Sequence, residues 1–127
     1  MRWYLVAIVL TVMMSALLWG CAGTRQEQRP VRGQIAVGDR QKDWALVYYQ
    51  SWRRAGKPTY LRLARRRMAD AIVTYFQIQV KIGHSFPDFY IVDRKRRESC
   101  RFLDEIDRDA GKFRVLLDDT AREGCLR

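Results

Sequence analysis

Residues 61–82, LRLARRRMADAIVTYFQIQVKI, decide the fold of this 127-residue chain. Their apolar positions recur at the spacing of an α-helix, from Leu61 through Met68 and Tyr75 to Ile82. Charged and polar side chains fall on the opposite side of the same helix. The stretch therefore predicts one long amphipathic helix.

The last seven residues of this stretch also fit a β-strand. Apolar and polar residues alternate strictly in FQIQVKI, residues 76–82, as they do in a half-buried strand. Residues 89–92 would then form the partner strand, and the fold would be α+β with a hairpin at 74–92. We prefer the helix because its periodicity continues unbroken from Leu61.

An aromatic pattern predicts a first helix at residues 39–55. Trp44, Tyr48 and Trp52 are spaced four residues apart, so they share one side of a helix that Gly56 ends. Such a stripe could stack on sugars, but an aromatic stripe at helical spacing is more typical of a protein core.

Two more helices are expected after Gly83. The segment Ser85-Phe86-Pro87-Asp88 resembles a helix start, with a cap, a proline in the first turn and an acidic residue. This third helix would end near Gly111, and residues 113–121 have the spacing of a fourth. The predicted fold is mainly α, a small four-helix bundle-like domain at residues 39–127.

The N-terminus has the parts of an export signal. A charged start is followed by residues 3–23, which carry no charge, and the run contains Leu18-Trp19-Gly20-Cys21. Through Leu18, Gly20 and Cys21 this segment resembles the lipobox of bacterial lipoproteins. The resemblance implies removal of residues 1–20, acylation of Cys21 with diacylglycerol and fatty acids such as palmitate, and a flexible tether at 21–38. Ala22 implies sorting to the outer rather than the inner membrane.

An uncleaved transmembrane helix is the alternative for this segment. The uncharged run of 21 residues is long enough to span a bilayer. Positive charges downstream, at Arg25, Arg29, Arg32 and Arg40, also oppose export of the domain. In that case the chain would be a single-pass membrane protein.

The two cysteines left after Cys21 allow one pairing, Cys100 with Cys125. In an oxidising periplasm they are expected to form a disulfide, and in the cytoplasm two free thiols. Both lie 12 or 13 residues from a turn near Gly111, so an antiparallel pair formed by the third and fourth helices would bring them together. The pairing and the bundle are therefore consistent with each other.

Positive charge is concentrated in the middle of the chain. Residues 53–97 hold 12 Lys and Arg against three Asp and Glu, whereas residues 98–127 hold six against eight. Two basic clusters could together bind a lipid headgroup, lipopolysaccharide or a cell-wall polymer; a solvated surface is the alternative. The anion-binding candidates are Arg65, Arg66, Arg67, Arg94, Lys95, Arg96 and Arg97.

The sequence contains no recognisable catalytic motif. His84 is the single histidine and lacks partner residues nearby, and a zinc site with Cys100 and Cys125 would need both thiols reduced. The run of carboxylates at 104–109 has no calcium-loop pattern and is typical of a solvated helix face. We expect no enzyme, no cofactor, no metal and no nucleic-acid partner.

These observations together predict a lipid-anchored protein on the periplasmic face of the bacterial cell envelope. It would act as a non-enzymatic interaction or assembly module whose partner is an envelope protein. The alternative function is binding of an anionic envelope component through the basic clusters. In size, anchor and helix content the chain is similar to small helical lipoproteins that escort secretion or pilus components.

Overall fold

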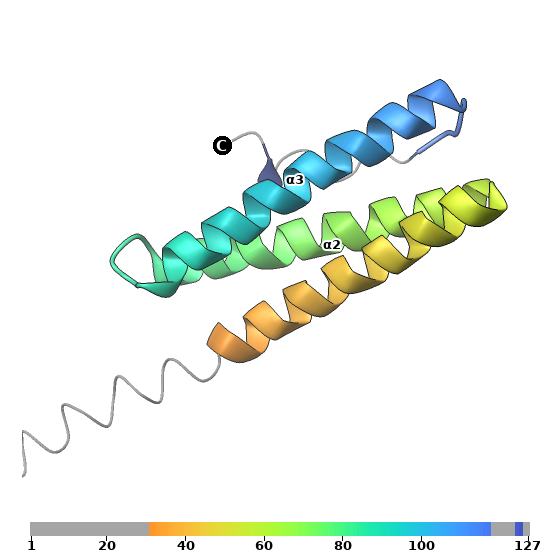
Figure 1. Cartoon of the computed structure of the whole chain (residues 1–127). Helices are drawn as coiled ribbons and strands as arrows, with labels where there is room; N and C mark the ends of the chain where they lie inside the picture. Colours follow the sequence, from red (N-terminus) through yellow and green to blue (C-terminus); the bar gives the residue numbers. More distant parts are fainter. Residues whose placement is uncertain (1–30, 118–123, 126–127) are drawn as a thin grey trace, which may run out of the picture. The chain divides into compact units, whose positions relative to one another are not determined.

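Three helices make up most of the domain in the computed structural model, which describes residues 31–117 and 124–125. The first described helix covers residues 31–55, and it is followed by α2 (Pro58–Ile82) and α3 (Asp88–Lys112) (Figure 1). The described residues contain no strand. The mainly helical, bundle-like fold predicted from the sequence is therefore confirmed.

The described helices are too short or too polar to cross a bilayer. The predicted signal peptide, Cys21 and the alternative transmembrane span lie outside the described residues.

Glycines end the first two helices where the sequence predicts. Gly56 has a φ of 67° and its N–H donates to Trp52 O at 2.7 Å, after which Pro58 opens α2. Gly83 has a φ of 68° and its N–H donates to Gln79 O at 3.0 Å. Because α2 is helical through Ile82, the alternative hairpin at 74–92 is wrong. The helical stripe outweighs the local alternation because it faces a core along the whole length of α2.

Two predicted boundaries differ from the structure. Residues 31–38 are already helical, so this part of the predicted tether at 21–38 belongs to the first helix. Residues 113–117, expected to begin a fourth helix, form a turn and an irregular segment. In this turn Arg114 has a φ of 54°, and Val115 N–H donates to Ala110 O at 2.8 Å. The rest of the expected fourth helix, 118–121, lies outside the described residues.

The helices α2 and α3 are antiparallel neighbours. Arg65 contacts Asp107 at one end of the pair, and Gln79 contacts Asp93 near the other. The core between the helices is closed by buried apolar side chains, of which each leucine, isoleucine or methionine contributes about 1.5–3 kcal/mol through burial. Its principal members are Ala45, Trp52, Leu61, Ala64, Met68, Ile72, Leu103, Ile106 and Ala110.

The first helix packs along both of these helices. Gly38 lies under the ring of Tyr75, whose hydroxyl donates to Asp39 at 2.6 Å. Asp39 also pairs with Lys95 of α3 at 2.8 Å. Burial raises the pKa of Asp39, but the hydrogen bonds from Lys95 and Tyr75 outweigh this and hold the pKa below its ordinary value. The first helix is thus joined to α2 and α3 by one partly buried carboxylate.

A disulfide joins Cys100 and Cys125, whose Cα atoms are 5.8 Å apart. Beside it, Gly124 packs on Ile72 of α2, and its carbonyl accepts a hydrogen bond from Arg96 Nη1 at 2.5 Å. Residues 124–125 therefore lie beside α3, as the predicted pairing requires, although residues 113–117 are not helical.

Candidate functional site

A pocket of about 590 Å³ lies between α2 and α3 where the two helices are joined. We call it the hairpin-end pocket. We call its polar lining residues, Gln79, Asp93, Arg96 and Arg97, the base of the pocket. We call the remaining lining residues its wall; they are Phe76, Val80, Gly83, His84, Phe89 and Tyr90.

The wall of the hairpin-end pocket exposes apolar side chains to solvent. Val80 and Tyr90 are 70% and 69% exposed, although both lie on helices that bury most of their apolar residues. The Phe89 ring packs against the His84 ring at 4.1 Å and edge-on to Tyr90 at 5.7 Å. A group of exposed apolar residues at one place is more typical of a binding surface than single exposed residues are.

Asp93 organises the base of the pocket. It accepts hydrogen bonds from Gln79 Nε2 at 2.9 Å and Arg96 Nη2 at 3.1 Å, and it pairs with Arg97. Burial raises the pKa of Asp93, but these three partners together lower it below its ordinary value. Since Arg96 also donates to Gly124, the base of the pocket is tied to the disulfide-closed end of the chain.

Four of the seven predicted anion-binding residues form ion pairs inside the domain. Arg65 is buried against Asp107 at 2.7 Å, and Lys95 pairs with Asp39. The other two, Arg96 and Arg97, share Asp93. Their charges are therefore largely committed to carboxylates of the same chain.

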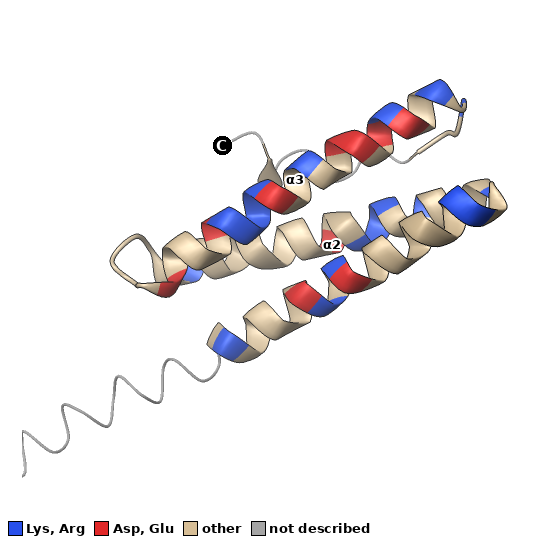
Figure 2. Cartoon of the chain, viewed as in Figure 1, with Lys and Arg blue, Asp and Glu red and all other residues tan. Residues whose placement is uncertain are grey.

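The remaining candidates, Arg66, Arg67 and Arg94, are exposed. The two basic clusters do not meet in one patch. Arg65 lies beside Asp107, and Asp107 is about 16 Å along α3 from Arg96 at 1.5 Å per residue. Figure 2 shows a run of basic residues on the half of α3 nearer the turn, whereas the other half carries most of the acidic residues of α3 together with further basic ones.

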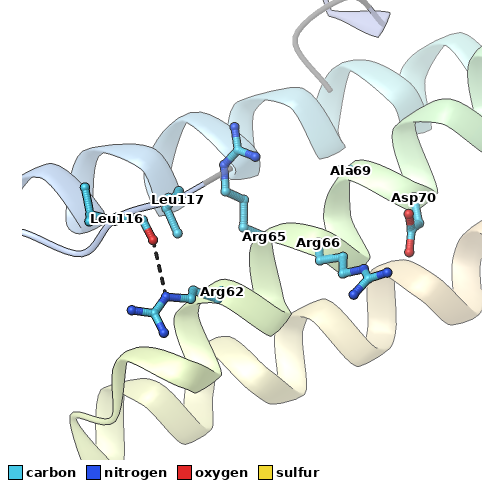
Figure 3. A pocket seen from close by; sticks show the side chains of 7 residues that line it. All are labelled: Arg62, Arg65, Arg66, Ala69, Asp70, Leu116 and Leu117. Carbon is cyan, nitrogen blue, oxygen red and sulfur yellow. Dashed lines mark hydrogen bonds between the residues drawn. The ribbon is translucent and has the colours of Figure 1, made fainter. Parts of the chain in front are cut away.

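A second pocket, of about 560 Å³, contains two of the predicted arginines (Figure 3). Arg62 Nε donates to Leu116 O at 3.3 Å, whereas the Arg65 side chain points the other way, toward α3. Arg66 lies on the open side, one turn from Asp70. The pocket is bounded by Leu117, whose continuation lies outside the described residues.

The predicted aromatic stripe of the first helix is divided between core and surface. Trp52 is buried and packs edge-on to Phe113 at 5.3 Å, as a core residue should. Trp44 is 50% exposed and stacks on Tyr48 at 5.9 Å. Val37 and Val47 are exposed beside it, seven residues before and three residues after Trp44. We call Val37, Trp44 and Val47 the Trp44 face.

No group of three metal-ligating side chains comes together among the described residues. The zinc site considered from His84, Cys100 and Cys125 is wrong because both cysteines are in a disulfide. His84 is exposed and packs on an aromatic ring, as expected of a turn residue.

The acidic run 104–109 is only partly a solvated face. Asp104 and Glu105 are exposed, but Asp107 pairs with Arg65 and Asp109 accepts a hydrogen bond of 2.5 Å from the Tyr49 hydroxyl. Burial and this contact with Asp109 raise the pKa of Tyr49. These two carboxylates stabilise the fold.

The sequence predicted neither Val80 nor Tyr90 as part of a site. It also did not predict that Trp44 is exposed. Each belongs to an apolar pattern that looks like part of the core. One feature of the sequence indicates their exposure. Val80 lies off the apolar stripe of α2 that contains Tyr75 and Ile78, and Tyr90 lies off the stripe of α3 that contains Val92.

No protein-family model, curated protein or solved structure matches this chain. Its function must therefore be argued from the geometry of its own residues.

Proposed function

We propose that the chain is a bacterial lipoprotein, acylated at Cys21, whose helical domain is a non-enzymatic interaction or assembly module of the cell envelope. The domain faces the periplasm, with the outer membrane favoured over the inner membrane. The anchor rests on the sequence Leu18-Trp19-Gly20-Cys21, and the interaction role rests on the surface of the described domain.

The observation that carries the interaction role is the half-exposed indole of Trp44. Exposed Val37 and Val47 lie on the same side of the first helix, while Ala45, the neighbour of Trp44, is fully buried on the other side. Tryptophan residues flanked by apolar side chains are frequent anchors of protein–protein interfaces. The Trp44 face therefore fits a partner protein better than it fits open solvent.

Site-specific photo-crosslinking in intact cells tests this role. A photoreactive amino acid at position 44 is expected to give a discrete protein adduct in the membrane fraction. Gln50 is exposed on the same helix outside the Trp44 face, so position 50 is the matched control and should give none. Equal labelling at both positions, or no adduct at 44, would contradict the interaction role.

Metabolic labelling with an alkyne fatty acid tests the anchor. The wild-type chain is expected to incorporate the label, and the Cys21→Ser variant to lose both the label and the cleavage of residues 1–20. A wild-type chain that stays in the membrane without label would instead support the uncleaved transmembrane helix.

Anion binding remains a second candidate because of the pocket in Figure 3. Arg66 is exposed there beside Arg62, and arginine side chains suit phosphate groups. Under this proposal Arg66→Glu would abolish binding of lipopolysaccharide or an anionic cell-wall polymer. Arg108→Glu, an exposed change on the acidic half of α3, is the control and should leave binding intact.

A further inference from the structure

The hairpin end of the domain combines exposed apolar groups with an excess of positive charge. Val80 and Tyr90 are the most exposed apolar residues there, and Ile91 beside Tyr90 is 43% exposed. Residues 80–97 contain five Lys and Arg against two Asp, of which Asp93 is already paired with Arg96 and Arg97. Lys81 and Arg94 are exposed at this end.

The first helix runs parallel to α3, so it begins at this same end. Asp39 contacts Lys95, and Lys42 contacts Glu98 at 3.1 Å, so both pairs join residues that are 56 positions apart. By this register residue 34 of the first helix lies level with Tyr90. Figure 1 shows the start of this helix near the turn between α2 and α3.

The chain therefore connects to its anchor from the hairpin end. Residue 34 is 13 positions after Cys21, so even a fully extended connection would span at most about 45 Å. The hairpin end, which holds Val80 and Tyr90, is therefore within reach of a membrane in which Cys21 is fixed.

We infer that the hairpin end is a second membrane contact, which binds the surface of an anionic phospholipid bilayer. The apolar residues that enter the headgroup region of the bilayer are Val80, Tyr90 and the aromatic wall of the hairpin-end pocket. A tyrosine suits this region because its apolar ring contacts lipid while its hydroxyl contacts water. Lys81 and Arg94 contact the phosphates. This inference rests on the proposed anchoring, because the anchor sets which end faces the lipid.

The apolar and the charged groups have separate roles at this contact. A cysteine that carries several acyl chains already attaches the protein stably, so this contact adds to the attachment without being required for it. Each basic residue close to an anionic surface strengthens binding by about fivefold. The contact would also restrict the orientation of the domain, and with it the direction in which the Trp44 face is presented.

Hydrogen exchange of the full chain in vesicles tests this contact. The chain is reconstituted into vesicles of phosphatidylcholine alone and into vesicles that also contain phosphatidylglycerol. Amides of residues 80–91 are expected to exchange more slowly in the anionic vesicles, while residues 62–74 exchange equally in both. Equal exchange of residues 80–91 in the two vesicles would overturn the inference, and would leave this surface to a protein partner.

Paired variants separate the surface from the fold. Val80→Glu and Lys81→Glu should each abolish most of the slowing in anionic vesicles. Val73→Glu, two turns earlier on α2 and 43% exposed, and Arg67→Glu are the matched controls and should retain it. Retained slowing in the Val80 and Lys81 variants would contradict the proposed contact.

The failure of this inference can be told from a failure of the proposed anchor. The chain is embedded in both vesicle types whether it is held by acylated Cys21 or by an uncleaved helix, and intact mass distinguishes these two. An unacylated chain with lipid-dependent slowing at residues 80–91 would overturn the anchor alone. An acylated chain without slowing would overturn the membrane contact alone.

Discussion

The middle of the bundle and its hairpin end differ in how far they bury apolar side chains. In the middle, the core is closed by fully buried residues such as Met68 and Ile72. At the hairpin end, apolar groups such as Val80 and Tyr90 are exposed. The difference indicates that the middle serves stability, whereas the hairpin end and the Trp44 face are available for binding.

Removing the disulfide is expected to have the largest effect on stability. A bridge across 25 residues contributes about 3.5 kcal/mol through the entropy of the unfolded chain. A Cys100→Ser/Cys125→Ser variant should lose this amount in urea denaturation, and the wild-type chain should lose it on reduction. If reduction left the urea midpoint unchanged, the disulfide would not stabilise the middle of the bundle, and this prediction would be wrong.

Two truncations on α2 compare the regions directly. Ile72 is fully buried beneath Gly124, so Ile72→Ala should lower the free energy of unfolding by about 3 kcal/mol. Val80→Ala, on the same helix, should change it by less than about 0.5 kcal/mol. Equal losses in denaturant titrations would show that Val80 is part of the core.

Two glycine substitutions should have opposite signs. A Cβ on Gly38 would lie 2.6 Å from the Tyr75 ring, so Gly38→Ala should destabilise the domain by about 2 kcal/mol through overpacking. A Cβ on Gly111 meets nothing within 4 Å, so Gly111→Ala should stabilise α3 by about 0.5–1 kcal/mol. If both substitutions shifted the melting temperature in the same direction, this prediction would be wrong.

Acid should weaken the base of the hairpin-end pocket. The pKa of Asp93 is lowered in the fold, so its contribution to stability is present above the unfolded pKa of about 3.9 and is lost as the pH falls through the folded value. Asp39 behaves in the same way. Asp93→Asn should therefore show a smaller loss of stability between pH 6 and pH 3 than the wild type, and an unchanged loss would contradict the role of Asp93.

The helices could be predicted from the sequence because their apolar stripes are regular. The long stripe from Leu61 to Ile82 predicted α2, including the part that also alternates like a strand. The pairing of Cys100 with Cys125 followed from their count and spacing. The turn at residues 113–117 could not be predicted, because these residues have helical spacing but Arg114 adopts a positive φ.

Which arginines are buried was harder to predict, because each buried arginine lies next to other basic residues in the sequence. Arg65 lies between Leu61 and Met68 on the stripe of α2, and Arg96 lies between Val92 and Ser99 on that of α3. Each is therefore buried, whereas the next arginines, Arg66 and Arg97, are exposed. The carboxylate partners of the two buried arginines lie on distant parts of the chain or one turn away. Counting the charges in the two basic clusters therefore overestimates how many basic side chains are available to bind an anion.

Intact mass of the protein extracted from its native membrane, measured before and after reduction, tests the central claim most directly. The account predicts a chain that begins at Cys21, carries the mass of a lipid, and gains the mass of two hydrogen atoms when the Cys100–Cys125 bridge is reduced. A chain that still begins at Met1, with three free thiols and no lipid, would contradict it.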